Sequence, residues 1–246
     1  MPSPFSLPGS FVLASALVLL AQDPLPSPPS APWTVKTGKI VEKTPDGAVD
    51  LDLDLPVLEG KALPAARDRI NQALRAASGA GQRLREAREA RRGHEAFLQK
   101  GAAAGARSDD SYACRSTFEV GRLDRDWVSV RLEAGGHRHG MAAGFTRWTA
   151  CTCSARTGRG LALADLFGPD WRARLAPLLQ DGLAHQDQDT FDPDWRAKVA
   201  RIEPGFWLKP EAMVFFYQRY EIAAGVRGVV TVVVPMAQIQ PLMLFR

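Results

Sequence analysis

An alternation of apolar and acidic side chains early in the chain restricts the fold more than any other feature of the sequence. Its members are Val49, Leu51, Leu53, Leu55 and Val57 on one side and Asp50, Asp52 and Asp54 on the other. Successive side chains of a β-strand point to opposite faces, so the pattern predicts a strand that buries its apolar face. A calcium loop also spaces its acids by two, but it needs a glycine turn and a late glutamate. We therefore interpret the aspartates as the solvated face of the strand.

Hairpin and helix signals surround this strand. A strand over residues 35–41 and a turn over residues 44–47 lead into it, which predicts a β-hairpin. Over residues 63–98 apolar side chains recur at helical spacing, with a break at Gly79 and Gly81. The second helical segment is rich in arginine and glutamate, which is typical of a solvated helix face with internal ion pairs. Contact with anionic wall polymers or phospholipid is the alternative interpretation.

The chain beyond residue 110 is predicted to be mostly strands. We expect strands over residues 112–120, 127–134, 145–153, 205–208, 213–217 and 229–234. Asp170 is the expected N-cap of a helix with a leucine stripe at positions 175, 178, 179 and 183, and a short helix closes the chain near residues 236–242. These elements predict an α+β fold, with an antiparallel or mixed sheet and helices packed on one side, in two subregions.

The N-terminus carries the pattern of an export signal. Residues 11–21 form an apolar run without a charge, far shorter than the roughly 20 residues of a membrane-spanning helix. A proline-rich stretch, residues 22–32, follows and predicts a stiff linker. We expect residues 1–21 to be a signal peptide cleaved near Ala21, so that the protein is periplasmic, associated with the cell envelope or secreted. No lysine or arginine precedes the run, and an uncleaved N-terminal membrane tether is therefore the alternative.

Charge and motif content argue against several functions. Lysine and arginine number 31 against 27 acids, a net charge of +4, and so small an excess does not indicate nucleic-acid binding. The sequence contains no nucleophile elbow, HExxH zinc motif, phosphate-binding loop or dinucleotide fingerprint. We therefore expect no nucleic-acid partner, no cofactor and no catalytic residue.

The most prominent candidate site is a run of glycines and histidines, Gly135-Gly136-His137-Arg138-His139-Gly140. Two histidines at spacing two on a strand point the same way and could ligate zinc. A third ligand would have to come from elsewhere, and the sequence nominates none, so we expect no metal. Glycines also permit a tight crossover between strands. We interpret the run as a shaped loop, and a metal-dependent envelope enzyme that uses it is the alternative.

The cysteine count is odd, so at least one of the three thiols is unpaired within the chain. Cys151 and Cys153 lie on the same face of an expected strand, too far apart for an unstrained disulfide. Cys114 lies in an expected partner strand and could pair with either of them in an exported protein. We therefore predict one disulfide through Cys114 and one spare thiol, with the choice between Cys151 and Cys153 left open.

The C-terminal part resembles a known family of exported domains. The matching blocks are, in order, residues 127–134, Gly135-Gly136 with His139-Gly140, residues 145–153, Thr157-Gly158-Arg159, and Leu163 with Asp165-Leu166-Phe167. They continue with Phe206-Trp207-Leu208, Pro210, Val214-Phe215-Phe216-Tyr217, Tyr220-Glu221-Ile222-Ala223, Gly228 and residues 229–235. This order is similar to that of the RsiV-like C-terminal domain of unknown function. That family includes the extracellular lysozyme-sensing domain of RsiV and domains of PdaC-type peptidoglycan deacetylases.

The resemblance implies a division of the chain and a role. Residues 107–246 correspond to the RsiV-like domain, and residues 33–106 correspond loosely to its small α+β companion domain. The implied role is binding rather than catalysis, with an envelope protein or a peptidoglycan-related glycan as partner; a mainly structural envelope protein is a further alternative. The expected ligand-binding residues are Gly135, Gly136, His137, His139, Gly140, Trp207, Tyr217 and Tyr220. Lysozyme itself is cationic, so a net charge of +4 gives no long-range attraction to it.

Overall fold

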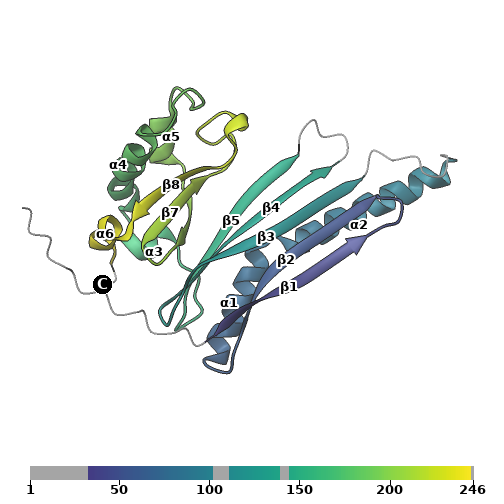
Figure 1. Cartoon of the computed structure of the whole chain (residues 1–246), viewed down its shortest axis with the longest axis horizontal. Helices are drawn as coiled ribbons and strands as arrows, with labels where there is room; N and C mark the ends of the chain where they lie inside the picture. The colour runs from purple at the N-terminus through teal and green to yellow at the C-terminus, as the bar shows by residue number, and fades with distance from the viewer. Residues whose placement is uncertain (1–32, 102–110, 139–143, 245–246) are drawn as a thin grey trace, which may run out of the picture.

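The computed structural model describes residues 33–101, 111–138 and 144–244 of the 246-residue chain (Figure 1). The expected signal peptide over residues 1–21, the linker over residues 22–32, and the candidates His139 and Gly140 lie outside the described residues. Among the helices that are described, none is long and apolar enough to cross a membrane.

Two sheets organise the chain, one of five strands in the order β1-β2-β3-β4-β5 and one of three in the order β6-β7-β8. The larger sheet contains β1 (Thr34–Lys43), β2 (Val49–Glu59), β3 (Tyr112–Leu123), β4 (Trp127–Arg138) and β5 (Phe145–Ser154). The smaller contains β6 (Gly205–Leu208), β7 (Ala212–Tyr217) and β8 (Val230–Pro235). All neighbouring strands are antiparallel except β2 and β3, which are parallel. The predicted α+β fold with a mixed sheet is confirmed.

Strand β2 forms where the alternation predicts it, but the predicted buried face holds only as far as Leu53, because Leu55 and Val57 are half-buried whereas Pro56 and Leu58 are buried. Leu53 and the other apolar residues at its start are buried, and the aspartates lie on the opposite face, across from lysines of β1. Lys39 is 3.3 Å from Asp52, and Lys43 is 3.1 Å from Asp50. Exposed ion pairs of this kind add little to the free energy of unfolding. They confirm that the acidic side of the strand is a solvated face.

Two helices connect β2 to β3 and lie on one face of the larger sheet (Figure 1). They are α1 (Pro64–Ala77) and α2 (Ala80–Gln99). Ile70 and Leu74 of α1 are fully buried in a cluster with residues of β4 and β5. The buried face of α2 carries small side chains, Ala87 and Ala90 among them. Gly79 separates the helices with a φ of 64°, a left-handed conformation that glycine adopts without steric cost. The predicted break is therefore confirmed at Gly79, whereas Gly81 lies within α2.

The smaller sheet packs against the remaining helices. These are α3 (Leu163–Phe167), α4 (Trp171–Ala184), α5 (Trp195–Arg201) and α6 (Met236–Ile239), with the 3-10 turns η1 (Gly225–Arg227) and η2 (Gln240–Leu242). The expected stripe of α4 is buried at Leu175, Leu179 and Leu183. Asp170 takes the N-cap position, but its side chain makes no capping hydrogen bond. The sequence does not predict α5. This helix has only seven residues, too few for a helical repeat of apolar side chains to be recognised.

The larger sheet draws on both of the expected domains. Strands β1 and β2 come from residues 33–106, whereas β3, β4 and β5 come from residues 107–246. The smaller sheet comes from the C-terminal stretch alone. The two subregions in space are therefore the larger sheet with α1 and α2, and the smaller sheet with α3 to α6.

Buried and partly buried hydrogen bonds join the two subregions. Ser129 of β4 is fully buried, and its hydroxyl accepts a hydrogen bond from the backbone N–H of Leu208 in β6 at 2.8 Å. The same hydroxyl lies 2.7 Å from the Thr152 hydroxyl of β5. Just after β7, the side-chain amide of Gln218 donates to the Trp148 carbonyl at 2.7 Å and accepts from the Trp148 N–H at 3.2 Å. The smaller sheet is therefore held on β4 and β5 by directional bonds as well as by apolar contact.

We predict that Ser129→Ala lowers the free energy of unfolding by about 2 kcal/mol, because it leaves the buried Leu208 N–H without an acceptor. Ser116→Ala is the matched control. Ser116 is also buried, but its hydroxyl only donates to the Asp54 carbonyl at 3.2 Å. Urea unfolding of both variants measures the difference. Equal losses would contradict the assignment of Ser129 as a docking contact.

Candidate functional site

The glycine–histidine run is mainly strand, which corrects the expectation of a loop. Residues 135–138 continue β4 and pair in register with β3, with His137 opposite Ala113. A Cβ atom on Gly136 would lie 2.2 Å from the Ala113 carbonyl oxygen and 2.9 Å from the Phe145 ring. The missing side chain lets β3 and β5 approach this end of β4 closely. Packing therefore accounts for this glycine without any ligand.

The histidines of the run do not assemble a metal site in the described structure. The side chain of His137 is exposed at the end of β4, and His139 lies outside the described residues. Among residues 33–101, 111–138 and 144–244, no three His, Cys, Asp or Glu side chains form a group that could hold a metal ion. The described residues therefore do not provide the set of metal ligands that the alternative, a metal-dependent envelope enzyme, would require.

Trp207 and Tyr217 belong to the core, which corrects their expected place on a binding surface. Trp207 is 3% exposed and Tyr217 is fully buried. Strand β7 is the central strand of the smaller sheet, and both of its faces are covered. One face contributes to the core with α4, and the other meets a ring cluster in which Trp207 lies 5.9 Å from Trp148. Burial raises the pKa of the Tyr217 hydroxyl well above its ordinary value, so this group stays neutral.

Tyr220 is the expected aromatic residue that does reach the surface. It is 67% exposed, and its φ of 70° lies in the left-handed region that a bulky side chain rarely adopts. Its ring lies so close to Gly225 that a Cβ atom there would be 2.1 Å from the ring. The Arg219 guanidinium lies 4.8 Å from the ring centroid. A conformation of this kind costs about 1 to 3 kcal/mol and persists because the surrounding contacts impose it.

Hydrogen bonds fix the loop between β7 and β8 that carries Tyr220. The backbone N–H of Gln218 donates to the Glu221 carboxylate at 2.6 Å, and Arg219 Nε donates to the Gly225 carbonyl at 2.8 Å. Arg219 Nη1 also donates to the Gly144 carbonyl at 3.4 Å. The loop is thereby tied to the start of β5, beside which it lies in Figure 1.

We define the Tyr220 surface as Arg219, Tyr220 and Val226. Val226 is 84% exposed, and it precedes Arg227, which anchors the far side of the loop. The Arg227 guanidinium donates to the Asp187 carbonyl at 2.8 Å and lies 4.4 Å from the Phe191 ring centroid. The sequence does not nominate Arg219 or Val226, because nothing in their residue type separates them from other surface side chains. Proximity to Tyr220 is the only sequence signal for them.

The three cysteines are free, which corrects the expectation of a disulfide through Cys114. Cys114 pairs in register with Gly136, whereas Cys151 pairs with Val130. These positions of β4 are separated by about 20 Å at roughly 3.3 Å per residue, and a disulfide needs Cα atoms within about 7 Å. Cys151 and Cys153 lie on one face of β5, as predicted, with their Sγ atoms 3.5 Å apart.

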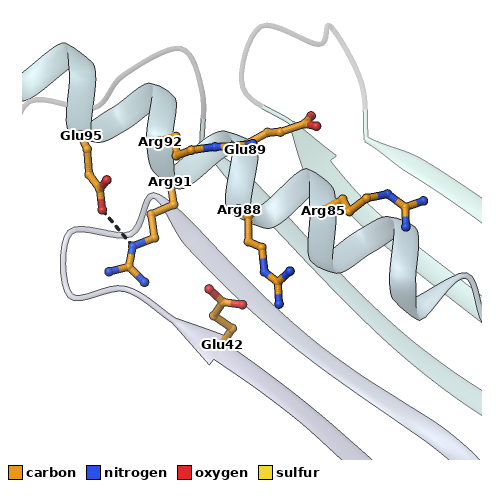
Figure 2. A pocket seen from close by; sticks show the side chains of 7 residues that line it. All are labelled: Glu42, Arg85, Arg88, Glu89, Arg91, Arg92 and Glu95. Carbon is orange, nitrogen blue, oxygen red and sulfur yellow. Dashed lines mark hydrogen bonds and ion pairs between the residues drawn. The ribbon is translucent and has the colours of Figure 1, made fainter.

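An open groove of about 580 Å³ lies between α2 and β1 (Figure 2). It is lined by Glu42, Arg85, Arg88, Glu89, Arg91, Arg92 and Glu95. Arg91 and Glu95 form an ion pair at 3.0 Å, as expected of a charged helix face. Within the described part of the chain, no other ion pair joins two of the lining residues. The lining therefore combines four arginines with three glutamates, a small excess of positive charge.

Comparison with known proteins shows that part of the chain is similar to a family of unknown function. Residues 164–237, from α3 into α6, match the family model described as "Protein of unknown function (DUF3298)". A DUF3298 family structure from Bacteroides fragilis NCTC 9343 has a TM-score of 0.66 at 17% identity, covering 87% of this chain and 95% of its own. Another from Pseudomonas aeruginosa PAO1 has a TM-score of 0.52 at 16% identity, covering 87% and 94%. No curated protein sequence matches the chain. At these identities the structural likeness concerns the fold.

We predict that Gly136→Ala lowers the free energy of unfolding by about 2 kcal/mol, because an added methyl group overpacks the contact of β4 with β3 and β5. Gly160→Ala is the matched control, since nothing lies within 4 Å of a Cβ atom at that position. Guanidinium unfolding compares the two variants. A Gly136→Ala variant as stable as the unaltered protein would contradict the packing role of this glycine.

The buried Tyr217 hydroxyl has no hydrogen-bond partner among the described residues, whereas the Tyr112 hydroxyl donates to Glu86 at 2.8 Å. We predict that Tyr217→Phe leaves the free energy of unfolding unchanged or raises it by up to about 1 kcal/mol. Tyr112→Phe should lower it by about 1 kcal/mol through the lost hydrogen bond. Thermal unfolding distinguishes the two, and a clear loss in Tyr217→Phe would reveal a polar role for that residue.

Proposed function

We propose that this chain is an exported cell-envelope protein that binds its ligand through the Tyr220 surface and acts by binding rather than by catalysis. The ligand in this proposal is a protein or a peptidoglycan-related glycan of the envelope. The observation that carries the proposal is the exposed Tyr220 ring, held at a positive φ by contacts within its own loop.

The cost of placing Tyr220 in this way supports a binding role. Contacts of the loop hold Tyr220 at a positive φ, although its side chain is mostly in water. A ligand that covered the ring would recover about 25 cal/mol for each Å² of apolar surface removed from water. Strained residues cluster at ligand contacts because the geometry they impose is used there. The sequence places this tyrosine within the RsiV-like motif as well.

The order of the loop also supports a binding role. Arg219 spans from Gly225 to Gly144, and Arg227 holds the other end of the loop on the α4–α5 connection through Asp187. A loop that is already fixed loses little conformational entropy when a ligand binds. The favourable free energy of the contacts with the ligand is therefore not reduced by a cost of ordering the loop.

The side chains of the Tyr220 surface suit a protein or a glycan. Tyrosine and arginine are enriched among the residues that dominate protein interfaces, because they combine large contact area with hydrogen-bonding groups. The exposed edge of the Tyr220 ring can contact apolar groups while its hydroxyl bonds to sugar or peptide oxygens. Val226 adds apolar area two residues before the tight turn at Gly228.

The location in this proposal rests on the sequence. The apolar run over residues 11–21 and the proline-rich stretch behind it indicate export. The DUF3298 match is compatible with the RsiV-like resemblance, and its description names no ligand.

Tyr220→Asn tests the proposal, because asparagine tolerates the left-handed backbone while the ring is removed. We expect the variant to bind about 30-fold more weakly, the effect of losing an interface residue that contributes about 2 kcal/mol. Soluble peptidoglycan fragments and immobilised muralytic enzymes are the probes, and surface plasmon resonance measures the affinity. Thermal unfolding of the variant checks that the fold is retained.

Two valines provide a matched control. Val226→Ala should weaken binding, whereas Val233→Ala should not, since Val233 is a comparably exposed valine on β8 outside the Tyr220 surface. Failure of the unaltered protein to bind either probe, or equal binding by Tyr220→Asn, would overturn the proposal. Cleavage of the peptidoglycan fragments, followed by mass spectrometry, would contradict its non-catalytic part.

A further inference from the structure

We propose that the groove between α2 and β1 is a second binding site, which takes a flexible polymer that carries phosphate groups. The site lies on the larger sheet and shares no residue with the Tyr220 surface. It goes beyond the function proposed above, and different variants test it.

The first argument is the charge pattern around Arg88. In a helix the neighbours of a side chain on the surface lie three and four positions away. For Arg88 these neighbours are Leu84, Arg85, Arg91 and Arg92, so none of them is acidic. Like charges at this spacing repel one another and destabilise the helix. A bound anion would relieve that repulsion. A solvated helix face on which positive and negative charges alternate has no such repulsion to relieve.

The second argument is the arrangement of the side chains on the two walls of the groove. In Figure 2 the side chains of Arg88 and Arg91 extend from α2 toward β1, where Glu42 lies opposite them. Glu42 pairs with the buried Leu51 in the β1–β2 register, so it is on the face of the hairpin that α2 covers. No ion pair joins Glu42 to either arginine among the described residues, and the space between them stays open. The groove therefore has room for a ligand between its walls.

The third argument concerns the chemistry of the ligand. A guanidinium donates paired hydrogen bonds to phosphate or carboxylate oxygens. A tetrahedral phosphate offers oxygens in several directions, so it can accept hydrogen bonds from two arginines one turn apart. Arg85 and Arg88 are separated by about 4.5 Å along the helix axis, which allows adjacent groups of one polymer to be bound together.

The shape and lining of the groove disfavour two other anionic surfaces. A bilayer is flat and cannot enter a recess beside a strand, and the groove carries no apolar side chain that would insert into lipid. Single-stranded nucleic acid is usually held by aromatic rings on which the bases stack, and no aromatic residue lines the groove. A thin chain of phosphates fits both features.

Binding of inorganic polyphosphate to the purified protein, measured by isothermal titration calorimetry, tests the proposal. We expect Arg88→Ala to weaken binding about fivefold, the upper range for an exposed charge contact. Glu42→Gln should strengthen it about threefold, because a carboxylate facing the phosphates is removed. Arg75→Ala is the matched control: Arg75 is an exposed arginine in the last turn of α1, outside the groove.

Three further arms decide the identity of the ligand. Poly(glycerol phosphate) in place of polyphosphate separates a phosphodiester polymer from a phosphoanhydride one, and binding of either polymer that Arg88→Ala weakens and Arg75→Ala does not supports the proposal. Polyglutamate that binds as tightly would overturn the preference for phosphate. Binding to anionic phosphatidylglycerol vesicles without binding to either polymer would replace the proposal with a membrane site. Loss of affinity that is equal in Arg88→Ala and Arg75→Ala would show a charge effect without a site.

Discussion

The parallel pairing of β2 with β3 determines where the other elements of this protein lie. Two adjacent parallel strands cannot be joined by a tight turn, so the chain has to cross from the end of β2 back to the start of β3. It does so through α1 and α2, which consequently cover one face of the larger sheet. That crossing brings α2 beside β1 and creates the groove that arginines and glutamates line. It also leaves β4 and β5 on the far side, where the smaller sheet docks.

Local patterns predict most of the elements, and they fail where tertiary contact decides. The alternation of β2 and the leucine stripe of α4 are visible in the sequence because each repeats over several pleats or turns. The break between α1 and α2 is visible because glycine favours a left-handed backbone there. The parallel register of β2 and β3 has no local signal, since it depends on which strands meet after the helical crossing. For the same reason the expected domains contribute jointly to one sheet.

The candidate site shows the same limit at the level of single residues. Glycine and aromatic side chains mark binding surfaces and cores alike, so residue type did not separate Gly136, Trp207 and Tyr217 from Tyr220. Both faces of strand β7 are covered, and Tyr217 is buried on the face that packs against α4. Tyr220, three residues later, escapes burial because the loop turns at a positive φ. The prediction of a disulfide was wrong for a related reason. The sequence does not show that the strand of Cys114, β3, is separated from the strand of Cys151, β5, by β4.

The side chain of Gln218 has a consequence for how this protein behaves at high concentration. An outer strand such as β5 presents unpaired N–H and C=O groups, which can recruit a strand from another molecule and start aggregation. The Gln218 amide occupies both groups of Trp148, in the manner of a single residue of an additional strand. A side chain thereby blocks edge-to-edge association at this point while the main chain remains free to form the loop.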